Sequence, residues 1–249
     1  MTGRARVFPD SVLFVGGDTR ASRAFYTLVV NGLSDGGAPG QRIPFVPAGD
    51  VPVPPSGCWV PCFATADKEA AVRRALALGA GPAGAVLVHD RHEAVYRAPD
   101  GALFRLTDLA CPSPPSRRLG DVAFFDLYTP QAEEAAAYYA RALSCRVMHE
   151  PQPTPGDYRL LTSEGEPVAG VVDMLDVLPS AVPPHWIPYL RVVDLEAEVA
   201  RLSDLGARVR VPATESALGP FALLADPFGV TFGLQTPASD ELLMQHAAF

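Results

Sequence analysis

One internal repeat constrains the fold of this chain more than any other feature of its sequence. The segment CWVPCFATADKEAAVRRALALGA (residues 58–80) aligns without a gap with HWIPYLRVVDLEAEVARLSDLGA (residues 185–207), at an offset of 127 residues. Trp59 aligns with Trp186, and both segments end in Leu-Gly-Ala. The segments that precede them, around FYTLV and YYARAL, form a weaker pair. This self-similarity indicates two homologous halves, each built from two smaller units.

Each unit has the pattern of a strand, an amphipathic helix and three further strands. In the fourth unit Asp194 is a suitable N-cap, apolar residues follow at helical spacing, and Gly206 marks the end of the helix. Three runs follow the helix, and each has the apolar pattern of a strand: RVRVPAT, FALLAD and VTFGLQ. The sequence therefore predicts an α+β protein of four βαβββ modules, two in each of two tandem domains.

The domain boundaries follow from composition. We predict an N-terminal domain over residues 1–110, a linker rich in proline and serine over 111–120, a C-terminal domain over 121–237 and a tail over 238–249. Residues 35–57 stand where the first module should place its last three strands, yet proline and glycine interrupt them repeatedly. Because proline cannot donate to a strand ladder, the first module is predicted to be eroded.

Charge and hydropathy exclude several classes of partner. The net charge is -8 and no basic run exceeds two arginines, which argues against nucleic-acid binding. No apolar run approaches ~18 residues and the N-terminus lacks a signal-peptide core, so we expect a cytoplasmic protein without membrane contact. The four cysteines show no CxxC spacing and are expected to be small buried residues.

Four segments together resemble the vicinal oxygen chelate superfamily, and most closely its two-domain glyoxalase and bleomycin-resistance-like proteins. They are FFDLYTPQAEEAAAYYARAL, YRLLTSEGEPVAGVVDM, HWIPYLRVVDLEAEVARLSDLGARV and FALLADPFGVTFGLQ, and the resemblance is fainter in the N-terminal half. It implies that paired modules curve their mixed sheets into a cup. In metal-dependent members, His and Glu side chains point into that cup and hold a divalent ion.

The resemblance also shows that the metal-ligand positions of this chain hold no ligands. Carried over onto this sequence, they fall at Phe125, Ile187 and Gly233 in the C-terminal half, and at Val12, Val60 and Arg105 in the N-terminal half. None of these side chains coordinates a metal ion. We therefore predict no metal and no cofactor, and neither metal-dependent glyoxalase nor extradiol dioxygenase activity.

Side chains alternate along a strand, so residues two positions from a ligand position should share its face. This adds further candidates to the cup beside Phe125, Ile187 and Gly233; they are Leu127, His185, Tyr189, Thr231 and Gln235. His185 is the candidate general acid or base, and the Tyr189 hydroxyl is suited to polarise a carbonyl. Asp126 is expected to point to the opposite face and to be structural.

Three further sites have two interpretations each. Arg105 either anchors an anionic or enolate-like ligand group, or forms a salt bridge, for which Asp10 is the expected partner. His149 faces either the cup or solvent, and is kept as a candidate ligand-binding residue. His89 and His92 flank acidic residues, but their spacing fits a solvated turn better than a metal site.

Two functions remain open from the sequence. The first is a metal-independent enzyme that acts on a small hydrophobic or aromatic metabolite in a natural-product pathway, by cyclisation, rearrangement or elimination. The second is a binding protein that sequesters such a molecule, as bleomycin-resistance relatives do. In both, the partner is a small molecule, and the fused halves allow a monomer as well as a homodimer.

Overall fold

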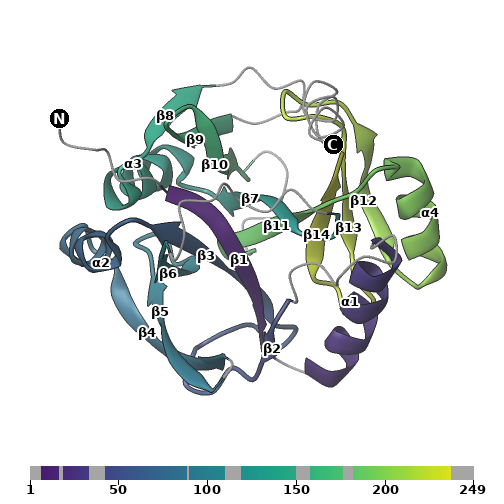
Figure 1. Ribbon diagram of the computed structural model, residues 1–249, viewed down its shortest axis with the longest axis horizontal. Helices are drawn as coiled ribbons and strands as arrows, with labels where there is room; N and C mark the ends of the chain where they lie inside the picture. Colours follow the sequence, from purple (N-terminus) through teal and green to yellow (C-terminus); the bar gives the residue numbers. More distant parts are fainter. Residues whose placement is uncertain are drawn as a thin grey trace, which may run out of the picture.

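The computed structural model describes residues 7–16, 19–33, 43–88, 90–109, 119–149, 158–175 and 182–236 (Figure 1). Most of the predicted linker, the whole predicted tail and His89 lie outside these residues. Within them, the chain forms two halves of similar plan, and each half has its own curled, mixed sheet. The predicted α+β class is confirmed.

The C-terminal half consists of two complete βαβββ modules. The first comprises β7 (Val122–Thr129), α3 (Ala132–Leu143), β8 (Arg146–His149), β9 (Tyr158–Ser163) and β10 (Glu166–Asp173). The second comprises β11 (His185–Arg191), α4 (Leu195–Asp204), β12 (Arg208–Thr214), β13 (Phe221–Ala225) and β14 (Thr231–Gln235). Together they form one eight-stranded sheet in the order β12-β13-β14-β11-β7-β10-β9-β8. The first strands of the two modules, β7 and β11, pair antiparallel at its centre.

The N-terminal half repeats this plan with one incomplete module. Its elements are β1 (Val7–Val15), α1 (Thr19–Leu33), β2 (Phe45–Val46), β3 (Cys58–Thr65), α2 (Lys68–Ala77), β4 (Gly81–Val88), β5 (Arg91–Arg97) and β6 (Leu103–Asp108). The six strands follow the order β2-β1-β3-β6-β5-β4. In the described part of the first module, the two-residue β2 is the strand found between α1 and β3, where the sequence pattern placed three strands. The erosion of this module stays a prediction.

Helix α4 begins and ends where the sequence predicted. Asp194 caps α4, since its Oδ1 accepts a hydrogen bond of 3.0 Å from the Ala197 amide. Asp67, its repeat partner, caps α2 through a 2.8 Å bond from the Ala70 amide. Such caps stabilise a helix by about 1 kcal/mol each. After α4, Gly206 adopts a φ of +94°, a left-handed conformation that favours glycine, and the chain turns into β12.

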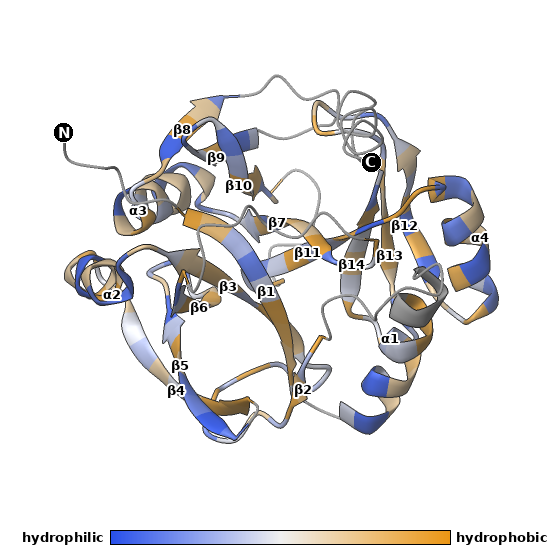
Figure 2. Cartoon of the chain, viewed as in Figure 1, coloured by the Kyte–Doolittle hydropathy of each residue, from blue (hydrophilic) through white to orange (hydrophobic). Residues whose placement is uncertain are grey.

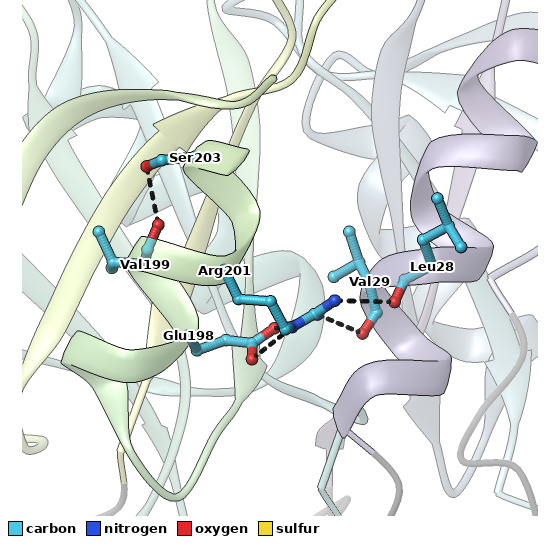
Figure 3. A network of polar contacts seen from close by, with 6 residues as sticks. All are labelled: Leu28, Val29, Glu198, Val199, Arg201 and Ser203. Atoms are coloured by element: carbon cyan, nitrogen blue, oxygen red, sulfur yellow. Dashed lines mark hydrogen bonds and ion pairs between the residues drawn. The ribbon is translucent and has the colours of Figure 1, made fainter. Parts of the chain in front are cut away.

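The two halves share one hydrophobic core. Phe63 of β3 packs edge-on against Phe125 and Trp186, with ring centroids 5.8 and 5.7 Å apart. Helices also pair across the halves, α2 with α3 and α1 with α4 (Figures 1 and 2). At the second pair, Arg201 of α4 donates to the Val29 carbonyl of α1 at 3.2 Å and to Glu198 of its own helix (Figure 3). Among helices in the described ranges, none has the length and apolarity needed to cross a membrane.

The opposite face of the N-terminal sheet, where a cup would lie, is filled with aliphatic side chains. Leu13, Val60 and Leu103 pack there against Val46 and Val51, which belong to the segment that replaces the missing strands. The segment lies so close that a Cβ at Gly84 would come within 3.2 Å of the Val51 side chain. The large cavity described next is instead on the C-terminal sheet.

Candidate functional site

A cavity of about 800 Å³ occupies the cupped face of the eight-stranded sheet. This volume is typical of pockets for drug-sized ligands. Its floor is largely apolar and comes from β7, β11 and β13, and residues 54–59 of the N-terminal half form part of the wall. The side chains used below are Phe124, Asp126, Tyr128, Tyr158, His185, Ile187, Tyr189, Arg210, Phe221, Leu223, Thr231 and Gln235.

Strand β7 presents Asp126 to the cavity, and this corrects the sequence prediction. Phe125 and Leu127, expected in the cup, are fully buried in the core that the halves share. Ile187 lines the cavity as predicted, and the residue paired directly opposite it is Asp126. Directly opposed residues share a face, so Phe125 and Leu127 must face the other way. The expected orientations of Phe125, Leu127 and Asp126 were therefore wrong.

Two tyrosine hydroxyls hold the Asp126 carboxylate. Tyr189 donates to Oδ2 at 2.7 Å and Tyr158 donates to Oδ1 at 3.0 Å. Burial raises the pKa of Asp126 from 3.8 to about 6, although both hydrogen bonds act to lower it. A carboxyl group with this pKa is ionised at neutral pH and accepts a proton more readily than an ordinary aspartate. It is therefore suited to general base chemistry.

Two glycines make room for this arrangement. A Cβ at Gly233 would lie 2.3 Å from Cδ1 of Tyr189, so the tyrosine ring occupies the space in which a side chain at 233 would lie. A Cβ at Gly170 would lie 2.0 Å from Oδ1 of Asp126 and 2.2 Å from the Tyr158 hydroxyl. The absent side chains therefore allow both tyrosines to reach the carboxylate. At Gly233, a predicted ligand position, a tyrosine ring takes the place of a metal-binding carboxylate.

The neighbouring groups stay neutral at ordinary pH. Burial, and then the negative charge of Asp126, raise the pKa of Tyr189 well above 10 and also raise that of Tyr128, so both hydroxyls keep their protons. Burial lowers the pKa of His185. Its ring stacks on Tyr128 at 5.7 Å, and Nδ1 lies 2.9 Å from the Pro183 carbonyl. Because a carbonyl only accepts, Nδ1 carries the proton and Nε2 is left as an acceptor.

The remaining predicted residues divide into two groups. Thr231 and Gln235 line the cavity with His185, Ile187 and Tyr189, as the alternation along β14 and β11 predicted. Arg105 and His149 lie elsewhere. Arg105 is buried in the N-terminal half and its ion pair is with Glu93, whereas Asp10 was the expected partner. His149 is exposed on β8, outside the lining of the cavity.

The donor set does not fit the divalent ion held by metal-dependent members of the superfamily that the sequence resembles. With the orientation of β7 corrected, the three strand positions hold Asp126, Ile187 and Gly233, of which only Asp126 has a side chain that can bind a metal ion. A facial site needs three protein ligands, usually two histidines and a carboxylate. Across the part of the chain that the structure describes, no group of three or more His, Cys, Asp or Glu residues could hold a metal.

Sequence reasoning missed Asp126 because both faces of β7 are buried. Its burial is nearly continuous, so VAFFDLYT shows no alternation from which the orientation could be fixed. The available signal was the aspartate itself. An acidic residue inside an otherwise apolar strand is rarely buried without partners, and here the partners are Tyr158 and Tyr189.

Comparisons with known proteins agree with this fold. Residues 122–235 match a family described as Glyoxalase-like domain. CFP32 of Mycobacterium tuberculosis and Mycobacterium bovis, which bears a provisional glyoxylase name, is 30% identical over 119 residues. That alignment covers 47% of this chain and 46% of the relative, so the chain matches only about half the length of these curated relatives.

Two solved structures extend the similarity to the whole chain. The Mn(II)-bound glyoxalase of Novosphingobium aromaticivorans is 15% identical with a TM-score of 0.65, covering 93% of this chain and 83% of that protein. The 2,3-dioxygenase LapB of Pseudomonas sp. KL28 is 15% identical with a TM-score of 0.61, covering 94% of each chain. At such identities the similarity concerns the fold and carries no activity to this chain. The predicted pair of tandem domains with curled, mixed sheets is confirmed.

Proposed function

We propose that this chain, whose C-terminal half is a glyoxalase-like domain in a two-domain vicinal oxygen chelate fold, is a metal-independent enzyme. Its proposed reaction is proton transfer on a hydrophobic or aromatic small molecule bound in the C-terminal cup. Asp126 is the proposed general base. The observation that carries the proposal is a buried carboxylate, with a pKa of about 6, held by two tyrosines in an apolar cavity.

The proposed chemistry begins with removal of a proton from carbon next to a carbonyl. The C–H bond breaks, the proton moves to Asp126, and the electron pair forms an enolate on the substrate. Once protonated, Asp126 accepts more weakly, which frees the Tyr189 hydroxyl to donate to the enolate oxygen. Return of the proton to another carbon gives a rearrangement. Attack of the enolate carbon on a second carbonyl gives a cyclisation, and loss of a leaving group gives an elimination.

The cost of keeping Asp126 in place supports an enzyme. A rise in the pKa of Asp126 from 3.8 to about 6 means that the folded protein with an ionised Asp126 is destabilised by about 3 kcal/mol, at 1.36 kcal/mol per pKa unit. Binding an apolar ligand needs no such group, whereas a general base does. The alternative, a sequestering protein, is favoured by the scarcity of titratable groups in the cavity. In that case Asp126 would accept a hydrogen bond from a ligand hydroxyl or amine.

Mass spectrometry of free and bound compounds would separate these functions. EDTA-treated wild-type protein and the Asp126→Asn variant are each incubated with a metabolite extract of the host cells. We expect the wild type to convert a compound that the variant binds unchanged. A compound that both proteins bind and neither converts would identify a sequestering protein. Equal conversion by both would remove Asp126 from the mechanism, and conversion that returns only with added Mn²⁺ or Fe²⁺ would contradict metal independence.

A further inference from the structure

We infer that the ligand of the C-terminal cup is an extended aromatic or polycyclic acid, whose carboxylate is held by Arg210 at the end of the cavity remote from Asp126. This inference names a substrate class for the proposed function and rests on it. Its first support is the charge pattern of the cavity. Among the lining residues that the structure describes, Asp126 and Arg210 are the only ones whose side chains carry a full charge at neutral pH.

Arg210 has no acidic partner among the residues that the structure describes. It lies on β12, is exposed, and lines the cavity, whereas Arg208 on the same strand does not. A guanidinium group presents a planar fork of donors that matches a carboxylate. A guanidinium at the edge of an apolar cup, with no carboxylate partner in the described ranges, is therefore suited to receive the anionic group of a ligand.

The strand register gives the length of such a ligand. Along the sheet, Tyr189 pairs with Gly233, Gly233 with Leu223, and Leu223 with Val211, the neighbour of Arg210. Tyr189, whose hydroxyl donates to Asp126, lies three strand spacings from β12, or roughly 14 Å along the sheet at about 4.8 Å each, and Asp126 itself lies one strand further, on β7. Curvature of the cup and the reach of the arginine shorten this span. A ligand that extends from the Tyr189 hydroxyl to the Arg210 guanidinium is therefore ~10 Å long, the size of about three fused rings.

The floor between the two ends is apolar and partly aromatic. Ile187 and Leu223 line it, and Tyr189 meets Phe221 edge-on with ring centroids 5.9 Å apart. Ring systems pack well on such a surface through offset and edge-to-face contacts. The floor thus suits the body of a planar molecule rather than a hydrated or strongly polar chain.

The separation of the two charges has a physical reason. A carboxylate close to Asp126 would repel its ionised form and raise its pKa further, which would weaken it as a base. At ~10 Å the repulsion is much weaker than in direct contact, because the Coulomb energy falls with distance. The chain also carries a net charge of -8, which disfavours the approach of anions. A cation at the cavity edge offsets this locally and makes the binding of an acid dependent on salt.

Fluorescence titrations with two anthracene probes test the inference. Anthracene-2-carboxylate and 2-anthracenemethanol share a system of three fused rings and differ in charge, and they are titrated into wild-type protein, Arg210→Gln and the control Arg208→Gln. We expect the wild type to bind the acid about tenfold more tightly than the alcohol. Arg210→Gln should lose about tenfold for the acid and nothing for the alcohol. Arg208→Gln should change neither.

Other results would overturn the inference. Equal losses for both probes in Arg210→Gln would show that the residue does not recognise charge. An equal loss for the acid in Arg208→Gln would show a general effect of surface charge, and no binding of the acid to the wild type would exclude the proposed class. The titrations measure binding and test only the ligand class, whereas the turnover comparison with Asp126→Asn tests the enzyme activity. Either proposal can therefore be contradicted without the other. Charge recognition without conversion would instead contradict the proposed enzyme activity.

Discussion

Replacing Tyr189 with phenylalanine should raise the pKa of Asp126 from about 6 by one to two further units. The variant removes one hydrogen bond, the 2.7 Å donation to Oδ2, from a buried carboxylate. A hydrogen bond to a charged group contributes about 1.5–3 kcal/mol, and one pKa unit corresponds to 1.36 kcal/mol, which gives a shift of about one to two units. The ring should stay in place, because Gly233 leaves its space open and Phe221 packs against it.

Carbon-13 NMR of protein labelled at the aspartate carboxyls would measure the shift directly. The Asp126 resonance is assigned as the one missing from Asp126→Asn, and its chemical shift is followed from pH 4 to 9. Tyr158→Phe serves as the control. Its hydrogen bond is longer, 3.0 Å, and its side chain is only partly buried, so a smaller rise is expected. An unchanged or lowered pKa in Tyr189→Phe would refute the account of how this carboxylate is held.

The remaining predictions concern space and pH. Gly233→Ala should displace the Tyr189 ring and raise the pKa of Asp126 in the same titration. The control, Ser203→Ala on the exposed face of α4, should leave that pKa unchanged. An unchanged pKa in Gly233→Ala would show that Gly233 does not set the position of the ring. The effect of Asp126→Asn on the free energy of unfolding depends on pH, because the pKa of Asp126 is raised in the folded protein. Between pH 4 and 6 the folded wild type binds more protons than the unfolded chain, so the stability of the wild type falls as the pH rises through this window. The variant should therefore be more stable than the wild type by up to about 3 kcal/mol at pH 7 in urea unfolding, with the difference shrinking towards pH 4; a constant difference over that range would contradict the raised pKa.

The sequence by itself determined the modules and their order. The caps at Asp67 and Asp194 and the stop at Gly206 are local signals, written in a few neighbouring residues. The gapless repeat indicated the number of modules. The prolines and glycines of residues 35–57 predicted the loss of strands from the first module, since each proline removes a backbone donor. The residues of β14 and β11 that face the cavity were also predictable, because side chains two positions apart on a strand share a face.

Only the tertiary structure decided which residues meet in the cup. Strand β7 is buried on both faces, one against the shared core and one in the cavity. Its pattern of apolar residues therefore could not show which of Asp126 and Phe125 faces the cavity. The filling of the N-terminal cup depends on where Val51 packs, and the site depends on the tyrosine ring that lies in the space left open by Gly233. These are contacts between strands distant in sequence. Their outcome follows from shape and close packing, which local patterns do not encode.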